Sequence, residues 1–187
     1  MDLSPYKRFV KLVNTFDLWK YKSLDFEEAK VLNRLYWYMG YRTFNRRFFF
    51  TPKITDSMKA QAKEILNEIG EYFKSCEKSR ALFYNPLVTV SLCDKHIGEL
   101  KEFYDSKVLI NLKNMYHYSI RFSDDLSDEV CEKLRTAILE NVSDEICKNK
   151  GGHLRAFGVT MNEMDSNTAR VETEKYAKAC SDILNAL

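Results

Sequence analysis

One segment of the sequence combines the side-chain types that bind nucleic acids. Arginines and a lysine are interspersed with aromatic residues between positions 41 and 53, where the sequence reads YRTFNRRFFFTPK. A guanidinium group holds a phosphate with two parallel hydrogen bonds, and an exposed aromatic ring stacks on an unpaired base with about 1–3 kcal/mol. The segment therefore predicts a surface for RNA or single-stranded DNA, made by Arg42, Arg46, Arg47, Lys53, Tyr41 and Phe44.

The same segment also has an interpretation without any ligand. Large aromatic side chains stabilise a fold most when they are buried, so the phenylalanines could form core while the arginines form its solvated rim. An exposed aromatic patch is the observation that separates the two interpretations. The cations are equally suited to the acidic surface of a partner protein, so this alternative stays open.

The distribution of charge supports a negatively charged partner. Residues 1–53 carry 11 Lys and Arg against 5 Asp and Glu, a net charge of +6, whereas residues 54–187 carry 18 against 22, a net charge of −4. The first segment also contains both Trp residues and 14 of the 25 aromatic residues. Since the whole chain has a net charge of only +2, the asymmetry is the informative feature.

Cysteine and histidine offer a second chemistry. Cys93 ends a predicted strand where a helix begins, and a helix N-terminus lowers the pKa of a thiol, with His96 or His117 available as the base. This pattern suits a small hydrolase or transferase whose site lies at the strand ends. Cys93 and His96 could also join Cys147 and His153 as zinc ligands, but the spacing is loose, and we expect no metal.

Glycine and acidic residues give no further site. With six glycines in the chain, Gly151-Gly152-His153 lacks the frame of a phosphate-binding loop, and we expect no cofactor. Acidic pairs such as Asp124-Asp125 fall where loops turn into helices, and there they complement the helix dipole.

The compartment expected from composition is the cytoplasm. Five cysteines without a close pair indicate reduced thiols rather than a disulfide framework. Charged residues interrupt every long apolar stretch near the N-terminus, and no signal-peptide order is visible there. We therefore expect no membrane partner.

The elements that must position these residues follow from hydrophobic periodicity. Apolar residues at three- and four-residue steps predict helices over residues 5–20, 25–40 and 56–78, with starts at Ser4-Pro5, Asp25 and Asp56. Three short β-branched and aromatic runs then predict strands over residues 87–93, 115–122 and 154–161. Helices are predicted between and after them, over residues 94–112, 127–138 with a possible extension to 146, and 168–186.

This order of elements predicts an α+β fold. A helical N-terminal subdomain of about three helices is expected to pack with a small three-stranded sheet flanked by helices. No Gly/Ser-rich linker separates the parts, so the sequence predicts a single domain over residues 1–187, with a mainly helical part over 1–84 and a strand–helix part over 85–187.

Three functions are compatible with these observations. The sequence favours a non-enzymatic protein that binds nucleic acid, or an acidic protein partner, through its basic and aromatic N-terminal third. The first alternative is the small hydrolase or transferase around Cys93 and His96. The second is a scaffold for protein–protein interaction. The absence of a nucleotide-binding loop places the enzyme behind the binding protein.

Overall fold

A computed structural model describes residues 4–80, 82–85, 87–92 and 105–187 of the chain. Two compact units make up the molecule, Met1–Glu68 and Ile69–Leu187. The boundary between them falls inside one long helix, α3 (Asp56–Arg80). A single core shared by the whole chain stays a prediction. No helix in the described ranges has the length and apolar character needed to cross a lipid bilayer.

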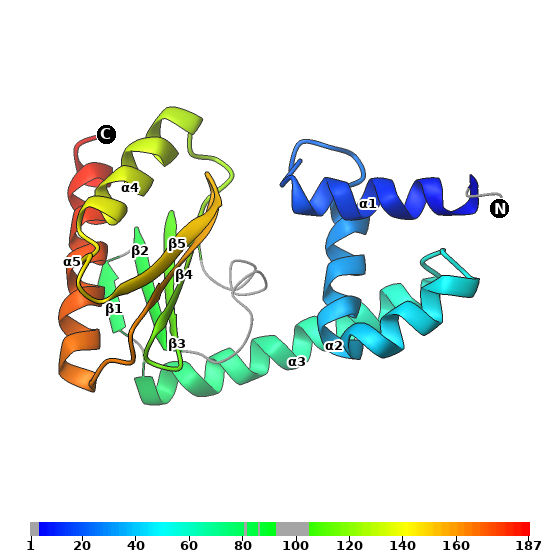
Figure 1. The fold of residues 1–187 in the computed structure, drawn as a ribbon, viewed down its shortest axis with the longest axis horizontal. Coiled ribbons are helices and arrows are strands. Elements are labelled where there is room, and N and C mark those ends of the chain that lie inside the picture. The colour runs from blue at the N-terminus through cyan, green and yellow to red at the C-terminus, as the bar shows by residue number, and fades with distance from the viewer. Residues whose placement is uncertain (1–3, 81, 86, 93–104) are drawn as a thin grey trace. The chain divides into compact units, whose positions relative to one another are not determined.

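The first unit is built from helices. A 3-10 turn (Ser4–Tyr6) leads into α1 (Lys7–Asp17), which lies across the start of α2 (Phe26–Phe50), and α3 follows (Figure 1). Gly40 divides α2, because its φ of 73° and ψ of 159° belong to a region that only glycine adopts readily. The predicted helix stop at Gly40 is confirmed as a break, after which residues 41–50 form a second helical segment.

Aromatic and aliphatic packing holds this unit together. The rings of Phe44 and Phe48, with centroids 4.5 Å apart, are buried against Phe9 of α1. Arg34 is buried in α2, and its Nη1 donates a hydrogen bond to the carbonyl oxygen of Ala62 in α3 at 3.2 Å. These contacts place both segments of α2 against neighbouring helices.

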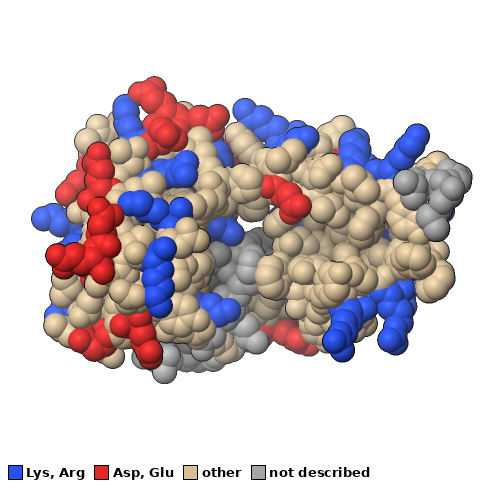
Figure 2. Space-filling model, in the orientation of Figure 1, with Lys and Arg blue, Asp and Glu red and all other residues tan. Residues whose placement is uncertain are grey.

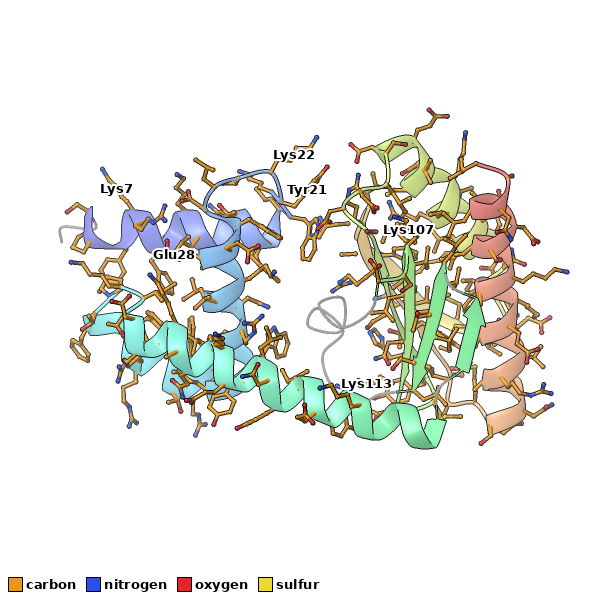
Figure 3. All side chains as sticks on the ribbon, turned by 180° about the vertical axis from the view of Figure 1, so that it is seen from behind. Lys7, Tyr21, Lys22, Glu28, Lys107 and Lys113 are labelled. Carbon is orange, nitrogen blue, oxygen red and sulfur yellow. The ribbon has the colours of Figure 1, made fainter. Side chains whose placement is uncertain are left out.

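An ion-pair cluster joins α1 to the start of α2. The carboxylate of Asp25 pairs with Lys11 at 2.6 Å and with Arg8, which also binds Glu28. Figure 3 shows Glu28 on the part of α2 that lies beside α1. Hydrogen bonds from Lys11 and then Arg8 hold the pKa of Asp25 below its usual value. The predicted helix start at Asp25 is confirmed, since Asp25 is the N-cap residue of α2, but its side chain makes no cap hydrogen bond and binds α1 instead.

Other helix starts use short polar side chains as caps. The hydroxyl of Ser127 accepts from the backbone N–H of Val130 at 3.2 Å, which confirms the predicted start of α4 (Asp128–Glu140). At α3, the hydroxyl of Thr55 accepts from the N–H of Met58 at 3.3 Å, so the cap lies one residue before the predicted Asp56.

The second unit is a mixed sheet with helices on one face. Within the described residues the sheet has six strands in the order β1-β2-β3-β4-β6-β5, of which β2 and β3 are parallel and all other neighbours antiparallel. Helices α4 and α5 (Ser166–Asn185) cover one face (Figure 1). The strands are β1 (Leu82–Asn85), β2 (Val88–Leu92), β3 (Val108–Lys113), β4 (His117–Phe122), β5 (Cys147–His153) and β6 (Ala156–Met161).

The α+β class is confirmed, while the sheet is larger than the predicted three strands. The predicted strands correspond to β2, β4 and β6, and the prediction missed β1, β3 and β5. Residues 108–112 were predicted as the end of a helix, which is wrong, because the run VLINL is buried on both faces of the sheet and shows no alternation. Strand β5 (CKNKGGH) is almost wholly exposed and carries no apolar pattern.

An ion pair beside the sheet is expected to make the stability of the second unit depend on acid pH. Lys107 directly precedes β3 (Figure 3) and binds Asp125 in the loop before α4, which lowers the pKa of Asp125 to about 2. A carboxyl group with a depressed pKa stabilises the fold above its unfolded pKa of roughly 4, and this stabilisation is lost as the pH falls toward 2. Both side chains are more than one-third exposed, so we expect a contribution below about 1 kcal/mol.

Urea titrations at pH 5, 3 and 2 measure this contribution. Asp125→Asn is expected to lose less unfolding free energy than the wild type over this pH range, because the amide cannot be protonated there. Far-UV circular dichroism follows the unfolding. An equal loss in the two proteins would show that Asp125 does not contribute to acid sensitivity.

Candidate nucleic-acid interface

The second helical segment of α2 exposes most of its residues. Of positions 41–50, eight are exposed, and only Phe44 and Phe48 are buried. At 100° per residue, Arg42, Arg46 and Phe49 lie on the side of the helix opposite these two anchors. A cationic and aromatic stripe therefore lies on the side that faces away from the core.

Exposed aromatic rings occur within this helical segment and just before it in the sequence. Tyr41 is 67% exposed and Phe50 81%, values that are unusual for large rings. Among the described residues, eight of the eleven exposed large apolar side chains belong to the first unit. We call the following residues the aromatic–basic surface: Trp37, Tyr38, Tyr41, Arg42, Arg46, Arg47, Phe49, Phe50 and Lys53.

No acidic residue lies between the members of the aromatic–basic surface in the sequence. Between Ala29 and Thr55 the chain contains six Lys and Arg and no Asp or Glu. Within the described part of the chain, the four cations of the surface form no ion pair, whereas Arg8 and Lys11 of α1 are paired with carboxylates. Figure 2 shows Lys and Arg side chains projecting from the first unit and acidic side chains gathered over α4 and α5. The cations of the surface are therefore available to an anionic ligand.

Phe44 requires a correction, since it was expected to stack on a base. Its ring is 6% exposed and packs on Tyr36 and Phe9, with centroid distances of 5.2 and 6.0 Å. The cause is helical spacing, because Phe44 and Phe48 are four residues apart and share the face that the core covers. The interpretation that the phenylalanines form core is therefore correct for Phe44 and Phe48, whereas Phe49 and Phe50 are exposed.

The sequence-based prediction of the surface did not include Trp37 and Tyr38, whose rings are exposed. The run Tyr36-Trp37-Tyr38 carried the signal, because three consecutive rings span about 200° of a helix and cannot all face one core. Only Tyr36 is partly buried, and it packs edge-on against Trp37 with centroids 5.5 Å apart.

A pocket of about 360 Å³ lies in the same unit, between α1 and α2. Phe16 of α1 lines it together with residues from both sides of the break at Gly40, because the break turns Phe44 back against Tyr36. Polar groups enter from Asp17, the last residue of α1, and from Asn33. The lining of the pocket is largely apolar, with four aromatic rings, and contains no cation.

The second unit brings together only part of the predicted chemistry. Cys93 and His96 lie outside the described residues, so the predicted nucleophile and its base stay a prediction. The Nδ1 atom of His117 lies 2.9 Å from the hydroxyl of Thr160, and burial, followed by the charge of Lys113, lowers the pKa of His117. His117 is thus packed within the sheet beside β6.

Cys147 and His153 are placed too far apart to share a metal ion. They occupy opposite ends of β5, and six residues of extended strand span roughly 20 Å. Across the described ranges, no group of three or more metal-ligating side chains is present. Strand β5 is also an edge strand with exposed Lys148, Lys150 and His153, which makes it a second cationic feature. Its Lys150 is paired with Asp144 at 3.4 Å.

Comparisons with known proteins give no family. No family model matches the chain, and no curated protein matches it. Among solved structures, RecJ from Thermus thermophilus, in complex with Mg²⁺, is similar at 13% identity and a TM-score of 0.49, covering 94% of this chain and 28% of RecJ. An uncharacterized protein from Helicobacter pylori is similar at 14% identity and a TM-score of 0.34, covering 91% of this chain and 59% of the other. This chain therefore spans less than two-thirds of either protein, and likenesses at this level do not bear on its ligand.

Proposed function

We propose that this chain binds single-stranded nucleic acid through the aromatic–basic surface. The observation that carries the proposal is the exposure of stacking rings and unpaired arginines on the same ten-residue helix, residues 41–50. Burial of large aromatic rings normally stabilises a fold, so a surface that leaves five of them exposed has another use.

Each type of side chain has its own part in binding. The guanidinium groups of Arg42, Arg46 and Arg47 donate hydrogen bonds to phosphate oxygens, and Lys53 adds a point charge. The rings of Tyr41 and Phe50 offer flat faces to unpaired bases. Every base has such a face, so this part of the contact tolerates different sequences.

The ring content favours a single strand over a duplex and over an acidic protein. Bases in a duplex are already stacked on each other, so exposed rings gain little from it. An acidic protein surface would use the cations but would leave the rings without planar partners. The neutralised carboxylates of Asp25 and Glu28 add no repulsion to an approaching phosphate.

A salt-titrated binding assay tests the proposal. Fluorescence anisotropy is measured with a 12-mer of single-stranded RNA, its DNA counterpart and a DNA duplex, for wild type and for Arg46→Ala/Arg47→Ala. Each phosphate contact on a single strand contributes about 0.7 to the slope of log K against log salt. We therefore expect the double variant to reduce the slope by roughly 1.4 and to bind about tenfold more weakly at low salt.

Lys148→Ala/Lys150→Ala is the matched control, because it removes the same charge from β5 in the second unit. Affinity close to that of the wild type in this variant would place the contact on the aromatic–basic surface. A larger loss than in the arginine variant would move the contact to β5. No binding of either single strand at low salt would overturn the proposed function and direct the search to a protein partner.

A further inference from the structure

The pocket between α1 and α2 has the walls of a site for a planar ligand. Its sides are the rings of Phe16, Tyr36, Trp37 and Phe44, which come from two helices and from both segments of α2. A volume of about 360 Å³ is at the lower end of the range of small-molecule sites, which is roughly 300–1,000 Å³. Tyr36 meets both Trp37 and Phe44 edge-on, so these walls offer ring faces and ring edges against which a flat heterocycle can pack.

Two polar side chains of this pocket are available for hydrogen bonds to a ligand. Within the described residues, the carboxylate of Asp17 and the side-chain amide of Asn33 have no hydrogen-bond partner. Asp17 is the last residue of α1, where the negative end of the helix dipole disfavours a carboxylate. Asp17 is exposed, so water solvates its carboxylate in the absence of a ligand, and a ligand with N–H donors can replace that water.

We infer that this pocket receives one unpaired guanine base from a bound single strand. Guanine is the base that presents two adjacent N–H donors, N1–H and the N2 amino group, and a carboxylate accepts both at once. The amide of Asn33 supplies a further donor and acceptor. This inference rests on the proposed function, since the pocket shares Trp37 with the aromatic–basic surface, which would hold the backbone of the same strand.

The negative charge of the pocket favours guanine over other ligands. A free phosphate or a carboxylate ligand would meet Asp17 and no cation in the pocket lining. An apolar side chain of a partner protein would bury that carboxylate without giving it a donor, which costs free energy. Adenine and cytosine offer a single amino group and thymine a single imino group, so each satisfies the carboxylate less completely.

Two DNA 12-mers test the inference by fluorescence anisotropy, one of thymidine only and one with a single central guanine. We expect the wild type to bind the guanine-containing strand about tenfold more tightly, which is about 1.4 kcal/mol. Asp17→Asn, which replaces one acceptor oxygen by a donor, is expected to bind both strands within about twofold of each other. Glu27→Gln is the charge-matched control, because Glu27 is an exposed acid of the same unit outside the pocket, and it should keep the tenfold preference.

The outcomes for the pocket and for the aromatic–basic surface are distinct. Arg46→Ala/Arg47→Ala is expected to weaken both strands equally and to leave the preference for guanine unchanged. Equal wild-type affinity for the two strands would overturn the guanine pocket while leaving single-strand binding intact. A preference that persists in Asp17→Asn would also overturn the pocket, and failure to bind either strand would overturn both proposals.

Discussion

Replacing Gly152 by alanine is expected to destabilise the second unit by about 3 kcal/mol, because the backbone at this position has no room for a side chain. Gly152 adopts a φ of 130° and pairs with Phe157 across β5 and β6. A Cβ atom at Gly152 would lie 2.6 Å from the Cα of Phe157 and 2.7 Å from the carbonyl oxygen of Ala156. Both are backbone atoms, so relief requires a shift of the hairpin itself.

Gly151→Ala is the matched control one residue earlier. Gly151 has no heavy atom within 4 Å of an added Cβ, so its replacement should change the unfolding free energy by less than about 0.5 kcal/mol. Urea unfolding followed by circular dichroism measures both variants, and tryptophan fluorescence reports the first unit separately, since both Trp residues lie there. Equal stability of the two variants would contradict the close approach at Gly152.

Loss of the guanidinium group of Arg155 should destabilise the same unit by about 3 kcal/mol. Arg155 follows β5 in the hairpin turn and is 4% exposed. Its Nη1 donates to the carbonyl oxygen of Ser123 at 2.8 Å, and its Nη2 to the carbonyl oxygen of Leu126 at 2.7 Å and to Asp128 at 2.6 Å. Arg155→Met keeps the aliphatic stem and leaves two carbonyls of the loop before α4 without this donor.

Asp128→Asn separates the carbonyl contacts from the ion pair. The Asp128 side chain is 75% exposed, so its pairing with Arg155 should contribute less than about 1 kcal/mol. Circular dichroism in urea measures the two variants beside the wild type. If Asp128→Asn were as destabilising as Arg155→Met, the ion pair rather than the carbonyl contacts would stabilise this loop.

Both predictions concern the hairpin that carries the second cationic feature. Lys148 and Lys150 lie on β5, so a hairpin displaced by Gly152→Ala would also displace them. If the nucleic-acid contact is confined to the aromatic–basic surface, Gly152→Ala should leave the affinity for nucleic acid unchanged and lower only the unfolding free energy. The binding assays and the unfolding assays then report on different units of the chain.

The cations of the aromatic–basic surface could be predicted from the sequence, but which phenylalanine rings are exposed on it could not. Arg42, Arg46 and Arg47 were identified because cations without acidic neighbours remain visible in any fold. The choice among the phenylalanines depended on which helical face meets α1, and this put Phe44 inside and Phe50 outside. Adjacent rings with the same chemistry differ only in their direction from the helix axis, which a sequence without a clear period does not specify.

Local interactions explain what the sequence determined by itself. The α+β class, the break at Gly40 and the cap at Ser127 follow from periodicity, backbone freedom and a hydroxyl next to a helix start, all of which act over a few residues. Tertiary structure alone decided that the Asp25 carboxylate pairs with α1 and makes no hydrogen bond to the first turn of α2, because Lys11 and Arg8 approach it from another helix. It also decided the pocket beside Asp17 and the strand pairing of exposed β5, since both require contacts between residues distant in the chain.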